Sequence, residues 1–241
     1  QEMESTYIQR NIDATRAAYG LDKLKTEQYK VTDKGEQGLA KEGDTTAQIR
    51  LLDPQVVSPT FKQLQQSKQY YTFADTLAVD KYEIDGVSQD TVIAARELDL
   101  AGNDNRNWVN DHTVYTHGYG VVAAYGNKVT ADGQPEFFES GIPTQGKLTE
   151  SEKYEPRIYF SPNTTEYSIV GAPEGTQAWE STPDRFGRRL TTFKGDGGPS
   201  VGNLFSRILY AIRFGSDQIL FSDRVTSESQ ILYDRSPKER V

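Results

Sequence analysis

The sequence predicts an α+β fold, in which a mixed, mostly antiparallel sheet built from hairpins packs with several helices. Short strand-like segments are separated by turn residues, and segments with helical spacing occur near both ends. Apolar residues at 35% and charged residues at 26% are typical of a globular chain. With 241 residues, roughly three quarters of the unfolded surface can be buried. We expect one domain over 1–241, and 200–241 is a candidate for a smaller helical lobe.

The N-terminal segment predicts an amphipathic helix followed by a long loop. Residues 7–19 place apolar side chains on one face at spacings of four and three, and Gly20 supplies a C-terminal stop. Residues 33–47 are polar and rich in glycine, without a hydrophobic period, and predict a loop between short strands near 28–31 and 48–52.

A second, shorter helix is expected over 59–66. Ser58 is a residue type that caps helix N-termini, and Pro59 suits the first turn because its missing N–H has no partner there.

Turn residues then predict a series of hairpins. Residues 77–84 and 91–98 are strand-like, and Asp85-Gly86 favours a tight turn, although residues 87–90 suggest a longer connection. Further strands are expected at 117–125 and 136–139 around Asp132-Gly133, at 157–160 and 167–170 around Ser161-Pro162-Asn163, and at 189–193.

The C-terminal part changes to helical spacing. Residues 204–212 carry a wide apolar stripe that ends at Gly215, and predict a helix buried in the core. Ser227 with Gln230 three residues later resembles a capping box, and predicts a last helix.

Charge and cysteine content exclude several classes of protein. The net charge is −8, and the longest basic clusters, Arg188-Arg189 and 238–240, are short and flanked by acids. Nucleic acid and anionic lipid need a concentrated basic face, so neither is an expected partner of this chain. No cysteine is present, which excludes disulfides and thiolate metal sites. No stretch reaches the roughly 18 apolar residues of a spanning helix.

The only two histidines, His112 and His117, lie close together in the sequence and are the sharpest candidates for chemistry. With Asp111 as an orienting carboxylate and Tyr115 as a donor, the imidazoles suit proton transfer or metal binding. A separation of five residues, however, points two side chains about 140° apart on a helix and to opposite faces of a strand. The alternative is that these side chains hold a helix-to-strand junction together by hydrogen bonds.

Other motifs predict no cofactor and no metal. The glycine-rich stretch 195–202 lacks the lysine and hydroxyl of a phosphate-binding loop, and Asp196 would repel phosphate. The acidic groups at 80–85 and 103–107 do not match the spacing of a calcium loop. No serine stands in a nucleophile elbow. Asn163 begins a glycosylation acceptor sequence, which has meaning only in a secretory pathway.

The run 107–122, NWVNDHTVYTHGYGVV, resembles the signature stretch of the bacterial membrane proteins called uncharacterised protein family 0182. The stretch 7–20, YIQRNIDATRAAYG, is similar to that family too, as are 49–66, 95–98 and most of 195–241. The chain departs from the family at residues 161–164, Ser-Pro-Asn-Thr, where a more acidic, glycine-containing connection is expected.

This resemblance implies that the chain is the extracytoplasmic part of a longer protein, anchored in the cell membrane by an N-terminal multi-helix region. It implies no catalytic or ligand-binding residues, because the family has no agreed activity. Two functions stay open. One is a non-catalytic module that binds an envelope protein or a small ligand, in cell-envelope assembly or transport. The other is an envelope-acting, hydrolase-like enzyme centred on Asp111, His112, Tyr115 and His117.

Overall fold

The structure is a computed structural model that describes residues 4–21, 24, 49–150, 154–174, 176–238 and 240. The chain divides into two units, 1–42 and 43–241. In the first unit, helix α1 (Ser5–Ala18) confirms the predicted N-terminal helix, and Gly20 follows it with a φ of 67°, a left-handed conformation that favours glycine. The predicted loop at 33–47 and strand at 28–31 lie outside the described residues.

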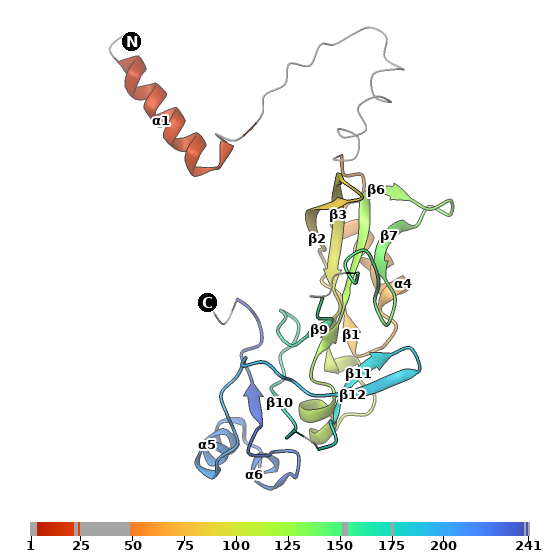
Figure 1. Cartoon of the computed structure of the whole chain (residues 1–241), viewed down its shortest axis with the longest axis vertical. Coiled ribbons are helices and arrows are strands. Elements are labelled where there is room, and N and C mark those ends of the chain that lie inside the picture. Colours follow the sequence, from red (N-terminus) through yellow and green to blue (C-terminus); the bar gives the residue numbers. More distant parts are fainter. Residues whose placement is uncertain are drawn as a thin grey trace. The chain divides into compact units, whose positions relative to one another are not determined.

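The second unit is built on a five-stranded antiparallel sheet in the order β2-β3-β6-β7-β8 (Figure 1). Its strands are β2 (Ala78–Ile84), β3 (Val87–Ala95), β6 (Val121–Val129), β7 (Pro135–Ser140) and β8 (Gln145–Gly146). The Asp85-Gly86 turn is as tight as two residues allow, because Ile84 pairs directly with Val87 and both turn residues have positive φ angles. The suggestion of a longer connection over 87–90 was therefore wrong, because these residues belong to β3.

Helix α4 (Pro54–Gln65) packs on one face of this sheet. Its Phe61 is fully buried against β3 and β6, in a cluster with Phe73, Val92 and Val122. The predicted helix exists, but its predicted start at Pro59, with Ser58 as the N-cap, was wrong. Asp53 caps it instead, because its carboxylate accepts hydrogen bonds from the Gln55 and Val56 amides. The remaining members of the cluster are Leu77, Ala94 and Ala124.

Four two-stranded antiparallel ladders complete the strands of the described residues. They pair β1 (Tyr71–Thr72) with β4 (Glu97–Leu98), β5 (Gly118–Tyr119) with β9 (Arg157–Ile158), β10 (Ser168–Val170) with β13 (Gln230–Leu232), and β11 (Glu180–Asp184) with β12 (Gly187–Thr191). The predicted hairpin of 157–160 with 167–170 was wrong, because β9 and β10 each pair with a strand distant in sequence.

Two more sequence predictions need correction. Residues 49–52 form no strand; instead, the Leu51 and Leu52 amides both donate to the Gly126 carbonyl at 2.8 Å. The described residues after Ser227 form no helix, because residues 230–232 pair with β10 as strand β13.

Helix α5 (Leu204–Phe214) forms where the spacing predicts it, with Gly215 as its left-handed C-cap, and a short helix, α6 (Gln218–Phe221), follows it. The expectation that its apolar stripe is buried was wrong. Among its residues only Ala211 is buried, whereas Tyr210 and Phe214 form an aromatic cluster with Tyr167 and Tyr233. With these rings packed inward, the apolar stripe of the helix faces outward. Its exposed side chains are Leu204, Phe205, Ile208, Leu209 and Ile212.

The predicted α+β class is confirmed by this combination of helices and antiparallel ladders. Among the described residues, no helix has the length and apolar character needed to cross a bilayer.

Candidate functional site

The 107–122 run contains one wide helical turn, η4 (Asn110–Val114), which is followed by β5 and the start of β6. In this turn the Tyr115 amide donates to the Asn110 carbonyl five residues earlier at 2.9 Å. Such π-type turns recur at functional sites. His112 projects from this turn. Its Nδ1 donates to the Tyr167 carbonyl at 2.7 Å, and its ring stacks on that of Tyr167 at 3.8 Å. Burial lowers the pKa of His112 below the ordinary value of a histidine.

Asp111 and Tyr115 serve other parts of the structure. Asp111 is buried, and its Oδ2 accepts from Arg106 Nε at 2.7 Å. Tyr115 packs its ring against Tyr70 at 4.7 Å. Among the described residues, neither side chain makes a hydrogen bond to a histidine ring, so Asp111 does not orient an imidazole there.

His117 lies fully buried in a different environment from His112. Its Nδ1 lies 3.0 Å from Thr116 Oγ1, which itself donates to Glu180 Oε2 at 2.9 Å. The imidazole Nδ1–H must therefore be the donor to Thr116, which leaves Nε2 to accept from the Thr182 hydroxyl at 3.2 Å. Burial, with further contributions from the cations Arg157 and Arg235, lowers the pKa of His117 to about 3.

His117 belongs to a buried polar network organised by Arg235 and Glu180. The Arg235 guanidinium is 1% exposed and donates to the backbone carbonyls of Tyr159, Glu166 and Thr116. It also donates to Ser168 Oγ at 2.8 Å. Burial lowers the pKa of Arg235 to about 9, so the group stays charged at neutral pH. A buried charge is tolerated only when its hydrogen-bonding groups find partners, and here they do.

Glu180 binds two of the residues that Arg235 contacts, Thr116 and Tyr159, through their hydroxyls. Its Oε2 accepts from Thr116 Oγ1 at 2.9 Å and from the Tyr159 hydroxyl at 2.8 Å, while Oε1 accepts from the Phe193 amide at 2.7 Å. Burial raises the pKa of Glu180, and these hydrogen bonds oppose the rise. Arg235 thus donates to the backbone carbonyls of Thr116 and Tyr159, and Glu180 accepts from the hydroxyls of the same two residues. The network is closed, which suits a structural role.

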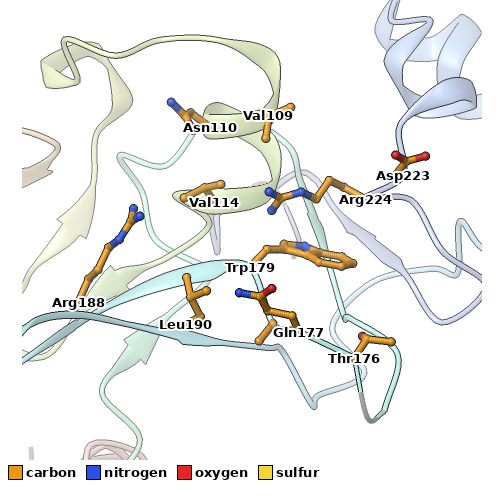
Figure 2. Close-up of a pocket in the computed structure, with 11 residues that line it drawn as sticks. Val109, Asn110, Val114, Thr176, Gln177, Trp179, Arg188, Leu190, Asp223 and Arg224 are labelled. Carbon is orange, nitrogen blue, oxygen red and sulfur yellow. The ribbon is translucent and has the colours of Figure 1, made fainter.

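A cleft of about 580 Å³ lies beside this network, between η4 and the β11–β12 hairpin. We call it the Trp179 cleft. Figure 2 shows Arg224 reaching across the indole of Trp179, with its guanidinium carbon 5.3 Å from the ring, a distance suited to a cation–π contact. Asn110 and Val114 supply the η4 wall, although none of the four sequence candidates lines the cleft. The lining residues are Val109, Asn110, Val114, Thr176, Gln177, Ala178, Trp179, Arg188, Leu190, Asp223 and Arg224.

Two hydrogen-bond donors of the Trp179 cleft lack a partner among the described residues. Trp179 Nε1 and Arg224 Nη1 are buried, and neither meets an acceptor within the described residues. Nor does Arg188 or Arg224 make an ion pair with a carboxylate of that part of the chain. A buried donor without an acceptor costs about 1–3 kcal/mol, so such atoms call for an explanation. Asp223 is the single acid among the lining residues.

Sequence reasoning missed this cleft and found only parts of its lining. The run 107–122 and the Arg188-Arg189 pair were noticed, and Trp179 is one of only two tryptophans in the chain. Nothing in the sequence brings Trp179 and Arg224 together, because 44 intervening residues fold between them and no motif links them. Among the described residues, no group of three or more histidines and carboxylates could hold a metal ion.

Comparison with known proteins gives a family and no activity. The model of the uncharacterised protein family UPF0182 matches residues 1–241. The chain is 96% identical to a UPF0182 protein of Bifidobacterium longum over all of its length, 82% identical to one of Bifidobacterium adolescentis, and 54% identical to one of Tropheryma whipplei over 99%. The chain spans only 23%, 22% and 25%, respectively, of the length of these three relatives. No solved structure matches it.

The different burial of the two histidines predicts different titration midpoints for their rings. We expect the His117 ring to stay neutral until the pH approaches 3, and His112 to titrate below the ordinary midpoint of about 6.5. Because the unfolded chain binds a proton at His117 through the window from about 6.5 down to about 3, acidification through that window removes stability. NMR titration of the imidazole resonances, assigned with His112→Gln, measures both midpoints. A His117 midpoint near 6.5 would show that its ring is hydrated, against this description.

Proposed function

This chain belongs to the uncharacterised protein family UPF0182, and from that premise we propose that it is a non-catalytic binding module of a longer, multi-pass membrane protein. The module lies on the extracytoplasmic side of the cell membrane, and the Trp179 cleft binds its ligand. We propose a role in cell-envelope assembly or transport. The observation that carries the binding function is the pair of unpartnered buried donors, Trp179 Nε1 and Arg224 Nη1, in one cleft.

The composition of the cleft supports ligand binding. Ligand sites are concave and largely apolar, with a few convergent polar groups that fix orientation. Val109, Val114 and Leu190 supply apolar surface, while Trp179 and Arg224 supply the polar atoms. The volume of about 580 Å³ lies within the range of small-molecule sites.

The membrane placement has a different basis. It follows from the resemblance of the 107–122 run to a family of bacterial membrane proteins, and it accords with a chain that spans only 22% to 25% of three relatives. The net charge of −8 opposes direct binding to anionic lipid or nucleic acid. Attachment to the membrane would then depend on an N-terminal transmembrane region of the longer protein.

An envelope-acting enzyme centred on Asp111, His112, Tyr115 and His117 stays a prediction, and the geometry does not favour it. A general acid or base must reach a bound substrate. The His117 ring is enclosed by Thr116, Thr182 and Tyr159, whereas the His112 ring stacks on Tyr167.

The proposed location predicts which side of the membrane the β6–β7 turn faces. Because this chain has no cysteine, Asp132→Cys places one thiol of known position on an exposed turn. In intact cells that produce the full-length protein, a membrane-impermeant maleimide should label this variant. Ala123→Cys, at a fully buried position, is the matched control and should react only after denaturation. The unsubstituted protein gives the background. Labelling of Asp132→Cys only after cell lysis would contradict the extracytoplasmic placement.

The binding function predicts that small molecules perturb one tryptophan and spare the other. The chain has two indole N–H groups, and that of Trp108 already donates to the Tyr167 hydroxyl at 2.8 Å. In ¹⁵N NMR spectra, screening with a fragment library of neutral, cationic and anionic compounds should shift the Trp179 indole resonance and leave that of Trp108 in place. Trp108→Phe assigns the two signals. If no fragment shifts the Trp179 signal, the Trp179 cleft is not a ligand site.

A further inference from the structure

The polar atoms that line the Trp179 cleft are mostly donors. A guanidinium and an indole can donate hydrogen bonds and accept none. This holds for Arg224, Arg188 and Trp179. The other polar lining residues are Asn110, Gln177 and Thr176, which can do either, and Asp223, whose carboxylate only accepts. A ligand that satisfies this set must bring acceptors.

The charge of the cleft leads to the same conclusion. Two arginines and one aspartate give the lining a net charge of +1, in a chain whose net charge is −8. Figure 2 shows the Arg224 guanidinium between η4 and Trp179, while Arg188 rises from β12 on the other side of the view. By contrast, Arg235 and Arg157 have their hydrogen bonds satisfied by the protein itself.

We propose that the Trp179 cleft binds an oxyanion, a carboxylate or a phosphate, carried on a ligand with an apolar body. This inference rests on the proposed function and names its ligand class. The oxyanion accepts hydrogen bonds from Arg224 Nη1 and Trp179 Nε1, the two buried donors of this cleft that meet no acceptor among the described residues. Arg188 adds positive charge, and the apolar body lies against Val109, Val114 and Leu190. A guanidinium suits both oxyanions because its forked N–H groups match their paired oxygens.

The test compares probes of one shape that differ in charge. Benzoate and phenyl phosphate carry the two oxyanions on the same ring, benzamide is the neutral counterpart of benzoate, and inorganic phosphate and acetate lack the ring. Each is titrated at constant ionic strength while the Trp179 and Trp108 indole resonances are followed. We expect benzoate or phenyl phosphate to bind at least about tenfold more tightly than benzamide, the ratio that one charge-assisted hydrogen bond supplies. The ring-free anions should bind more weakly than the ring-bearing ones.

Variants of single arginines show whether the cleft is the site. Arg224→Gln should weaken binding of the preferred anion about tenfold or more, and Arg188→Gln should weaken it less, since Arg188 has no buried unpartnered atom. Arg185→Gln, an exposed position that does not line the cleft, is the matched control and should leave binding unchanged. An unshifted Trp108 resonance verifies that each variant is folded.

The outcomes separate the two proposals. If benzamide binds as tightly as benzoate, or if Arg224→Gln binds the anions like the unsubstituted chain, the oxyanion inference is wrong while the binding function stands. The same holds if neutral or cationic fragments shift the Trp179 resonance and none of the anions does. If no probe of any charge shifts it, both proposals fail.

Discussion

The Arg235 guanidinium, buried and charged, is the constraint on which the C-terminal half of the structure depends. Burying a cation is costly unless its donors meet acceptors, and its acceptors come from three segments: Thr116 after η4, Tyr159 after β9, and residues Glu166 and Ser168 at β10. Because Arg235 itself follows β13, satisfying it brings together parts of the chain up to 119 residues apart. Glu180 then fastens Thr116 and Tyr159 a second time, to β11.

The Trp179 cleft follows from this arrangement. Its walls are η4, the β11–β12 hairpin and the segment between α6 and β13, and each of these is continuous with a segment that the network holds. The network and the cleft differ in one decisive respect. Arg235 and Glu180 have their hydrogen bonds satisfied within the protein, whereas Trp179 Nε1 and Arg224 Nη1 find no acceptor in the part of the chain that the structure describes. Satisfied buried polar groups hold a fold together; unsatisfied ones in a cleft suit recognition of a ligand.

The sequence predicted those features that neighbouring residues decide, and it missed those that depend on contacts between residues far apart in the chain. The Asp85-Gly86 turn and the Gly215 end of α5 were predicted because both are decided by backbone preferences of neighbouring residues. The pairing of β10 with β13 could not be predicted, because it joins strands about sixty residues apart. The outward stripe of α5 was misjudged because periodicity identifies an apolar face without naming what covers it. For the candidate site, residue type drew attention to His112 and His117, but the contacts that decide their roles come from Tyr167 and Thr182, more than fifty residues away.

Arg235 holds the elements around the Trp179 cleft together independently of the five-stranded sheet. Native-state hydrogen exchange of Arg235→Gln measures this most directly. Arg235 satisfies three carbonyls and one hydroxyl, and each buried acceptor that loses its donor costs about 1–3 kcal/mol. In this variant, amide protection should fall mainly in β10, β11 and β13, while β3 and β6, which pack around Phe61, should retain theirs. Protection that is unchanged in β10, β11 and β13, or that falls equally in every strand, would contradict it.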